Sequence, residues 1–187
     1  MLRNFGDLVG GLMATTMNGT MITLDGSFTM SKVVPGTYQL QLQPLPTPDW
    51  YIKAISFGRT DGLRDGLALE SSPDSPIEVL LSPNAGSIKG TVVDRDGKVV
   101  PNNRVILIPN EPSRFDRFKF STTDANGAFN IRGIYPGAYR LFAWDMLEPN
   151  AERDPDFVRQ YEEQGKSVAV AEGTNPGVEL RLIKVVP

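Results

Sequence analysis

The chain has few side chains that could catalyse a reaction. Cysteine and histidine are both absent from its 187 residues. Their absence removes thiolate nucleophiles, the usual zinc ligands and the commonest general base. Ser27, Ser121 and Thr122 carry hydroxyl groups, but no histidine is present to activate them, so we expect them to be polar groups of strands or turns. The sequence therefore predicts that the protein is not an enzyme and uses no cofactor.

One group of carboxylates has a spacing that invites a chemical interpretation. It consists of Asp154, Asp156 and the neighbouring pair Glu162-Glu163. Paired carboxylates can act as general acid and base. The surrounding residues favour a different interpretation, in which these side chains form the solvated face of a capped helix.

Two short segments superficially resemble calcium-binding loops. One begins at Asp94 with the sequence Asp-Arg-Asp-Gly, and the other begins at Asp124 with Asp-Ala-Asn-Gly. A calcium loop of this type needs an acidic residue eleven positions after its first aspartate, where this chain has Val105 and Tyr135. We therefore expect two tight turns and no metal site.

An aromatic row provides the candidate ligand-binding residues. In a strand expected near 138–145, Phe142 and Trp144 lie on one face, and Tyr161 lies on a nearby helix. The favoured interpretation is that Phe157 and Tyr161 of the helix pack onto the strand as a small second core. The alternative is an exposed platform, on which Phe142, Trp144 and Tyr161 would stack against a sugar ring.

The loop 111–119 is a second candidate for binding. It places Phe115 and Phe118 among basic residues, namely Arg114, Arg117 and Lys119. Loops often carry binding residues, but the packing of one phenylalanine beneath a long loop is the favoured explanation here.

An internal repeat predicts the elements that carry these residues. Residues 25–40 match residues 126–141, and residues 77–81 match residues 178–182. The offset is 101 in both blocks, since 126 − 25 and 178 − 77 are each 101. Each copy has an Asp-Gly or Asn-Gly turn, a strand with an inward row, and a Pro-Gly turn into a Tyr-x-Leu strand. We expect residues 25–40 and residues 126–141 each to form a hairpin.

The second copy is predicted to contain seven strands, which is typical of a β-sandwich. We expect them at 87–94, 103–109, 117–123, 127–132, 138–145, 166–171 and 177–184. A helix is expected near 155–164, because Asp154 can cap it, Pro155 suits its first position and Gly165 can end it. The corresponding stretch of the first copy, 50–57, alternates like a strand instead.

The first copy lacks a counterpart of the opening strand of the second. Gly90 would map to a position before Met1, because 90 − 101 is negative. We therefore expect two domains, an incomplete one over residues 1–84 and a complete one over residues 85–187. An incomplete sheet has an unpaired edge, which predicts edge-strand pairing with another chain.

Four motifs of the second copy together resemble a known family. They are Gly-Thr-Val-Val-Asp-x-x-Gly, Val-x-Leu-x-Pro, Thr-Asp-x-x-Gly-x-Phe and Gly-Ile-x-Pro-Gly-x-Tyr, at residues 90–97, 105–109, 123–129 and 133–139. They resemble the carboxypeptidase regulatory-like domain, a prealbumin-like sandwich related to Cna-B-like domains. The match spans most of residues 86–184 and part of residues 20–84.

The resemblance implies an all-β chain of two tandem Greek-key β-sandwiches, of the seven-stranded prealbumin-like or immunoglobulin-like type. The first is truncated at its N-terminus, and the second contains one short helix. It also implies an exported bacterial accessory domain without catalytic residues of its own. Cna-B-like relatives form isopeptide bonds from lysine. Lys89 lies on the first strand of the second copy, but no well-placed acidic catalyst accompanies it, so no such bond is expected.

Charge and hydropathy limit the partners. The net charge of −3 disfavours binding to nucleic acid, because no basic field is available to neutralise phosphates. The longest apolar stretches are much shorter than the roughly 20 residues of a membrane-spanning helix. Residues 1–14 lack the pattern of a signal peptide, so we expect any signal sequence to lie upstream and the protein to be secreted, periplasmic or on the cell surface.

The sequence thus predicts a non-catalytic structural or interaction module of a multidomain protein. Its partner, a protein or a glycan, is not identified by the residues. The alternative function is a carbohydrate-binding module that uses the aromatic platform described above.

Overall fold

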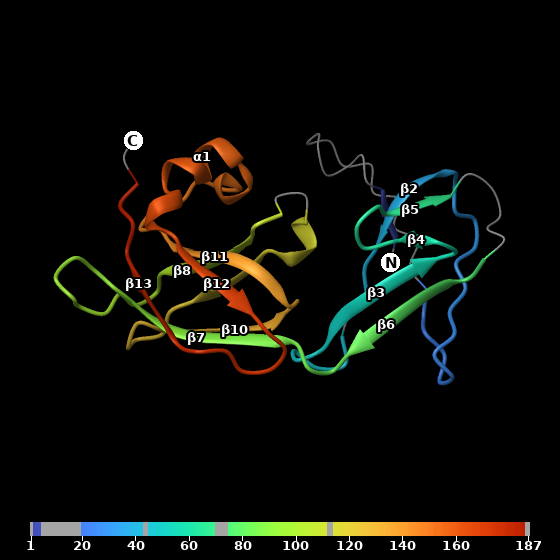
Figure 1. The fold of residues 1–187 in the computed structure, drawn as a ribbon, viewed down its shortest axis with the longest axis horizontal. Helices are drawn as coiled ribbons and strands as arrows, with labels where there is room; N and C mark the ends of the chain where they lie inside the picture. The colour runs from blue at the N-terminus through green and yellow to red at the C-terminus, as the bar shows by residue number, and fades with distance from the viewer. Residues whose placement is uncertain (1, 5–19, 43–44, 70–74, 112–113, 186–187) are drawn as a thin grey trace. The chain divides into compact units, whose positions relative to one another are not determined.

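The structure is a computed structural model that describes residues 2–4, 20–42, 45–69, 75–111 and 114–185 (Figure 1). The chain divides into two compact units. The first unit comprises residues 1–47 and 52–82, and the second unit comprises residues 48–51 and 83–187. Both are built mainly from strands, with one short α-helix in the second, so the predicted all-β class is confirmed.

The described residues of the second unit form seven strands, one in each region where the sequence predicts one. They are β7 (Gly86–Val93), β8 (Arg104–Pro109), β9 (Lys119–Thr122), β10 (Ala128–Ile134), β11 (Gly137–Ala143), β12 (Lys166–Val170) and β13 (Val178–Arg181). One sheet has the order β10-β7-β13, and the other has the order β12-β11-β8-β9. Within them, β13 runs parallel to β7, and the other strand pairs are antiparallel.

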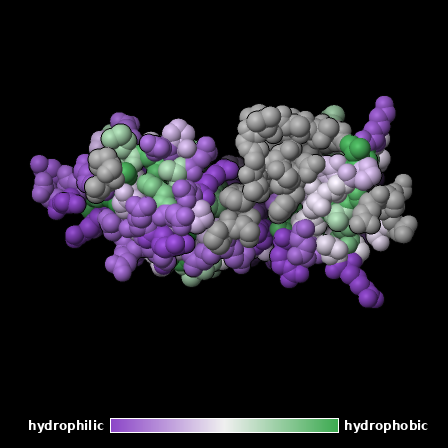
Figure 2. All heavy atoms as spheres, turned by 90° about the horizontal axis from the view of Figure 1, so that it is seen from above, coloured by the Kyte–Doolittle hydropathy of each residue, from purple (hydrophilic) through white to green (hydrophobic). Residues whose placement is uncertain are grey.

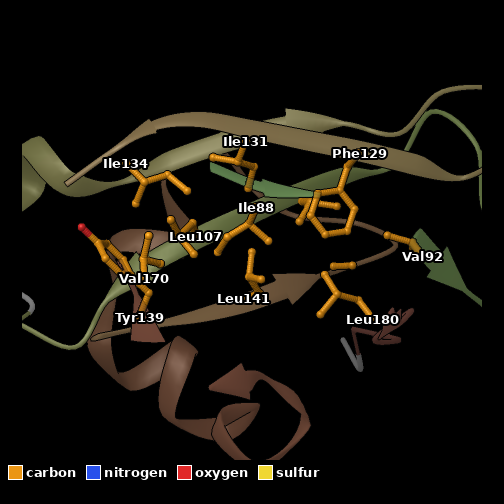
Figure 3. Packing of buried hydrophobic residues seen from close by; sticks show 12 residues of the cluster. Ile88, Val92, Leu107, Phe129, Ile131, Ile134, Tyr139, Leu141, Val170 and Leu180 are labelled. Atoms are coloured by element: carbon orange, nitrogen blue, oxygen red, sulfur yellow. The ribbon is translucent and has the colours of Figure 1, made fainter. Parts of the chain in front are cut away.

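The core of the second unit lies between these two sheets (Figure 3). Alternation along each strand directs one row of side chains inward, as the period of two requires. Phe129 and Ile131 of β10 face Tyr139 and Leu141 of β11 across the core. Twelve buried residues form this cluster, and burial of such side chains contributes about 1.5–3 kcal/mol each for the larger ones.

The expected hairpin between 127–132 and 138–145 is wrong. The turn before Gly137 joins β10 to β11, but these two strands lie in different sheets. The turn from Asp124 to Ala128 likewise connects β9 to β10 across the sandwich. Turn residues specify a reversal of the chain, whereas the pairing of the strands that follow depends on which neighbour completes each sheet.

The predicted helix is present on the outer face of the second sheet. The α-helix α1 (Pro155–Gln160) lies between two 3-10 turns, η3 (Ala151–Arg153) and η4 (Glu162–Gln164). Asp154 caps α1 through a hydrogen bond that its Oδ1 accepts from the Asp156 amide, at 2.9 Å. Pro155 occupies the first helical position, where its missing N–H group costs no hydrogen bond.

The described residues of the first unit form six strands, of which β3 begins at Tyr51, the last residue of the 48–51 segment of the second unit. They are β1 (Leu2–Asn4), β2 (Gly36–Leu40), β3 (Tyr51–Phe57), β4 (Thr60–Asp61), β5 (Leu67–Leu69) and β6 (Ile77–Ser82). They form two three-stranded sheets, of order β1-β2-β5 and β4-β3-β6. The predicted strand over 50–57 is confirmed as β3, and the buried core is smaller, consisting of Tyr38, Ile55, Leu67 and Leu69.

The strand that the sequence predicts after the first Asp-Gly turn does not form. The turn itself is present, because the Gly26 amide donates to the Thr23 carbonyl and Gly26 has a φ of 85°. Phe28 to Met30, however, are not in a strand. Their counterpart in the second unit, β10, is held by pairing with β7. Among the described residues of the first unit, no strand lies beside Phe28 to Met30. A strand without a partner cannot satisfy its backbone groups in a sheet, which accounts for the difference.

Candidate functional site

The predicted aromatic residues meet on the outer face of the β12-β11-β8-β9 sheet. Phe142 and Trp144 stack nearly parallel, with ring centroids 4.6 Å apart and an interplanar angle of 8°. Phe157 and Tyr161 from the helical segment cover Trp144, at centroid distances of 5.7 and 6.2 Å. The rings therefore pack in the offset and edge arrangements that aromatic pairs prefer.

The exposed platform expected as the alternative is not present. Phe142, Trp144 and Tyr161 are only 1%, 3% and 6% exposed. They form a second core with Ile106, Ile108 and Ile183, and Phe157 and Val158 pack against it. A sugar ring stacks on an open aromatic face, and the helical segment occupies that face here. This burial corrects the platform hypothesis and supports the packing interpretation.

A cleft of about 340 Å³ opens beside this second core. Ile108, Phe118 and Val158 contribute apolar surface to it, and the following polar side chains also line it: Asn110, Arg140, Glu152, Arg153, Arg159 and Glu162. Arg140 Nη1 lies 2.5 Å from Glu162 Oε1, and Arg159 Nη1 lies 3.3 Å from Asp156 Oδ1. These ion pairs join two arginines of the cleft to neighbouring carboxylates.

Glu152 is the buried acidic residue of this cleft. Its Oε1 lies 4.0 Å from Arg104 Nη2, while its Oε2 has no hydrogen-bond partner within the part of the chain that the structure describes. A buried acceptor without a partner costs about 1–3 kcal/mol, so a water molecule or a small donor beside Glu152 would stabilise this region. The sequence gives no signal for this position, because Glu152 becomes buried only when η3 folds back onto the sheet.

The loop 111–119 forms a cluster of arginine and tyrosine side chains. The guanidinium carbon of Arg117 lies 4.0 Å from the centre of the Tyr135 ring, an arrangement that favours a cation–π interaction. Arg114 is buried and binds Asp116 through two hydrogen bonds of 2.9 and 2.8 Å. Tyr51, which belongs to the second unit, packs edge-on against Tyr135 at 5.2 Å.

Burial around this loop changes two proton affinities. It lowers the pKa of the Lys119 ammonium and raises the pKa of Tyr139 to about 12. Phe118 packs against the second core, as the packing interpretation of this loop expected. Sequence reasoning singled out the arginines and Lys119 but missed Tyr135, which lies eighteen positions after Arg117 and meets it only in the folded chain.

The segments that superficially resembled calcium loops are turns. Asp94 Oδ1 accepts hydrogen bonds from the amides of Asp96 and Lys98, both at 2.9 Å. Asp124 Oδ1 accepts equivalent bonds from the amides of Asn126 and Ala128, at 2.8 and 2.9 Å. Each carboxylate therefore holds its own turn. Over the described ranges, no group of three or more acidic residues is placed to hold a metal ion.

The other candidate polar residues also have local partners. Ser27 Oγ donates to Asp25 Oδ1 at 2.9 Å within the first turn, and Asp154 caps α1. Ser121 and Thr122 lie in β9, as polar groups of a strand. Glu163 is exposed at the end of the helical segment. The structure brings these residues to turns, caps and strand surfaces and does not gather them into one site.

A comparison with known families gives a match over residues 87–182, about half of the chain, to the carboxypeptidase regulatory-like domain. The chain belongs to this family. The match covers most of the second unit of this carboxypeptidase regulatory-like protein. Among curated proteins, none matches the chain. Within the described residues of this family member, no helix is long and apolar enough to cross a membrane.

Several solved structures are similar to this carboxypeptidase regulatory-like chain. The Bacillus anthracis TIE protein is 16% identical, with a TM-score of 0.35, over 62% of this chain and 20% of that one. A proposed carbohydrate-binding protein from Pseudomonas aeruginosa is 18% identical, with a TM-score of 0.37, over 52% of this chain and 88% of that one. The major pilin subunit of Bacillus cereus is 17% identical, with a TM-score of 0.34, over 60% of this chain and 34% of that one. The match thus covers a fifth of the first of these proteins and a third of the last.

Proposed function

We propose that this chain is a non-catalytic structural and interaction module of an exported or cell-surface bacterial multidomain protein. On this proposal it consists of two tandem domains of one architecture, over residues 1–84 and 85–187, of which the first is incomplete. The observation that carries the proposal is that the two units share strand register, because a duplicated scaffold is typical of spacer and docking proteins.

The shared register appears in the pairing of β2 with β5 and of β11 with β12. Gly36 lies opposite Leu69, and Gly137 lies opposite Val170. Adding 101 to the residue numbers of Gly36 and Leu69 gives Gly137 and Val170, so the two strand pairs have the same register. The residues of β5 differ from those of β12, so this common register supports the proposal independently of the repeat in the sequence.

The strand on the other side of β2 in its sheet also corresponds to the strand on the other side of β11. β1 pairs with β2 as β8 pairs with β11, and Leu2 lies opposite Leu40 where Leu107 lies opposite Leu141. A tyrosine after each Pro-Gly turn makes the same contact. The Tyr38 hydroxyl donates to the Val34 carbonyl at 2.6 Å, and its counterpart in the second unit makes the same bond.

The use of the polar side chains supports a structural role. The aspartates of the turns, the cap of α1 and the ion pairs of the cleft rim each stabilise local geometry, as the preceding section describes. Membership of the carboxypeptidase regulatory-like family supports an accessory role in an exported protein. The partner that the module contacts is a protein or a glycan on this proposal.

Cell fractionation of the native bacterium tests the proposed location. An antibody raised against residues 85–187 should detect the protein in the extracellular, periplasmic or surface fraction, and protease added to intact cells should remove any surface pool. A cytoplasmic marker protein, which must resist the same protease, is the control. Recovery of the protein in the cytoplasm together with this marker would contradict the proposal.

A further inference from the structure

The cleft of about 340 Å³ in the second unit contains a carboxylate whose hydrogen bonding is incomplete. The side chain of Glu152 lines this cleft and is only 10% exposed. Its Oε2 is buried and has no hydrogen-bond partner among the described residues. Arg104 Nη2 lies 4.0 Å from the other oxygen, Oε1, which is beyond hydrogen-bonding distance. Buried polar groups are nearly always hydrogen-bonded, so a donor from outside the described chain belongs beside Glu152.

The missing donor need not be a cation. The guanidinium group of Arg104 is close enough to compensate the negative charge of Glu152, although it donates no hydrogen bond to the carboxylate. What Glu152 lacks is therefore an N–H or O–H group. Because the terminal torsion of a glutamate is broad, either carboxylate oxygen can turn toward a donor that enters the cleft.

The charged side chains of the cleft also favour a neutral ligand. Three arginines line it, Arg140, Arg153 and Arg159, together with the two glutamates Glu152 and Glu162. An organic cation would be repelled by the arginines, and an organic anion would be repelled by the buried carboxylate. A group that both donates and accepts hydrogen bonds suits both kinds of side chain.

The ion pairs of the cleft leave donors for such a ligand. Arg140 pairs with Glu162 through Nη1, and Arg159 pairs with Asp156 through Nη1. A guanidinium group has five N–H donors, so each arginine can also donate to a ligand. Asn110, which is exposed, adds a side-chain amide to the lining.

Apolar side chains form the rest of the cleft. Ile108, Phe118, Phe142 and Val158 are among its lining residues. Figure 2, which is seen from the side on which Figure 1 places α1, shows small hydrophobic areas in green among hydrophilic residues of the second unit. Apolar walls with a few converging polar groups are typical of small-molecule sites. The expected ligand therefore carries CH groups on one face and hydroxyl groups around its edge.

We propose that this cleft binds the ring of a neutral sugar. Hydroxyl groups of the sugar donate to Glu152 and accept from arginine N–H groups, and its CH face packs against the apolar side chains. The site lies beside the helical segment, so Trp144 and Tyr161 remain covered. The inference rests on the proposed function and deepens it, because it names a glycan as the partner of the interaction module.

Titration of the purified full chain with single sugars tests the proposal. The probes are the methyl glycosides of glucose, galactose, mannose and N-acetylglucosamine, each added to about 50 mM, which detects dissociation constants of about 10 mM. NMR follows the indole N–H of Trp144, because this ring stacks on Phe142, which lines the cleft. A Trp50→Phe chain assigns the resonance. We expect at least one sugar to shift it saturably, and no saturable shift with any of the four would overturn the proposal.

Charged sugars test the choice of a neutral ligand. The probes are an amino sugar and a uronate with the same ring configuration as the sugar that binds, so that charge is the main difference. Each should bind at least about threefold more weakly than the neutral sugar. A smaller difference for either charged ring would contradict the choice.

Variants of the full chain locate the binding. Glu152→Gln replaces the charged acceptor by a weaker neutral one, and Asn110→Ala removes the amide. Their controls are Glu163→Gln and Gln160→Ala, which change exposed residues outside the lining. The cleft variants should lose at least about fivefold in sugar affinity, and the controls less than about twofold. Sugar binding that Glu152→Gln leaves unchanged would overturn the assignment to the cleft.

Folding is checked by circular dichroism in the same samples. Asn110 is exposed, so Asn110→Ala should keep the spectrum of the parent chain and decides the assignment if Glu152→Gln does not fold. The outcome is separate from that of cell fractionation. A surface protein that binds none of the sugars would retain its proposed role with a protein partner, and the sugar site would be rejected. A cytoplasmic protein that binds a sugar in the cleft would retain the site, and the proposed location would be rejected.

Discussion

At the scale of single residues, two buried tyrosines hold equivalent turns. The Tyr139 hydroxyl donates to the Tyr135 carbonyl at 2.6 Å, across the turn that carries the chain from β10 to β11. Tyr139 is 1% exposed, so its hydroxyl cannot exchange this bond for one to water without local opening. The bond therefore links the connection between the two sheets to the core beneath it.

Replacement of Tyr139 by phenylalanine tests this contact. Tyr139→Phe keeps the ring in the core and removes the hydroxyl donor, so the free energy of unfolding should fall by about 1–2 kcal/mol. Urea unfolding of the full chain measures the change. Ser167→Ala, which removes an exposed hydroxyl from β12, is the control and should change the free energy of unfolding by less than about 0.5 kcal/mol. Equal effects of the two substitutions would contradict the role given to the hydrogen bond.

The same tyrosine predicts a dependence on alkaline pH. Burial raises the pKa of Tyr139 from 10.0 to about 12, so between these values the unfolded chain loses the proton first. The folded state then binds more protons than the unfolded state, and the free energy of unfolding falls as pH rises from 10 to 12. The fall should be smaller in Tyr139→Phe. Parallel urea titrations at pH 9 and at successively higher pH check this difference, and identical slopes for both proteins would exclude it.

At the scale of elements, α1 determines whether the aromatic row is open or covered. The helix has only six residues, so its own hydrogen bonds cannot maintain it in water. Its N-cap at Asp154 and the packing of Phe157 and Tyr161 onto Trp144 stabilise it. The cap and the second core therefore depend on each other.

Removal of the cap should loosen this cover. Asp154→Ala leaves the Asp156 amide without its acceptor, and the free energy of unfolding should fall by about 1 kcal/mol. Because Trp144 lies beneath the helix, its fluorescence should become more accessible to a soluble quencher. Glu163→Ala, at an exposed position of the same segment, is the control and should leave both signals unchanged. Unaltered quenching in Asp154→Ala would show that packing alone holds the helix.

The parallel pair of β7 and β13 depends on a glycine. A Cβ added at Gly90 would lie 2.0 Å from the Val178 carbonyl oxygen, which is backbone and cannot move without separating the strands. Gly90→Ala should therefore lower the free energy of unfolding by about 2–3 kcal/mol.

Gly177 provides a matched control for this substitution. A Cβ there would lie 3.7 Å from the Lys89 carbonyl oxygen, an ordinary contact on the same side of the sandwich. Gly177→Ala should change the free energy of unfolding by less than about 1 kcal/mol. Thermal and urea unfolding of both variants measure the difference. A Gly90→Ala protein as stable as Gly177→Ala would show that the strands accommodate the methyl group.

At the scale of the whole molecule, the two units differ in how much core they bury. Among the residues that the structure describes, the main core of the second unit has twelve buried residues, and that of the first has four. Buried apolar surface is the main stabilising contribution in a small domain, so the first unit should be the less stable of the two.

Hydrogen exchange of the full chain measures this difference at matched positions. The backbone amides of β2 and β5 are equivalent to those of β11 and β12, because both pairs have the same register. We expect the first pair to exchange at least about tenfold faster, since opening of the first unit exposes less apolar surface. Equal protection of the two pairs would contradict the ranking.

The local elements of this protein could be predicted from its sequence. Alternation of apolar residues predicted the seven strands of the second unit, and the cap at Asp154 predicted α1. The carboxylates of Asp94 and Asp124 predicted turns and not metal sites. These features depend on residues close together in the chain, where backbone geometry and short-range hydrogen bonds determine the outcome.

The arrangement of those elements was decided by tertiary structure. The repeat of 101 residues predicted two similar units, but it also predicted hairpins that instead connect different sheets. It predicted a strand at Phe28 to Met30, which needs a neighbour that the described residues of the first unit do not supply. The sequence alone also left open whether Phe142 and Trp144 are covered, because the answer depends on where a distant helix packs. Burial and strand pairing join residues far apart in the chain, so only the folded molecule determines them.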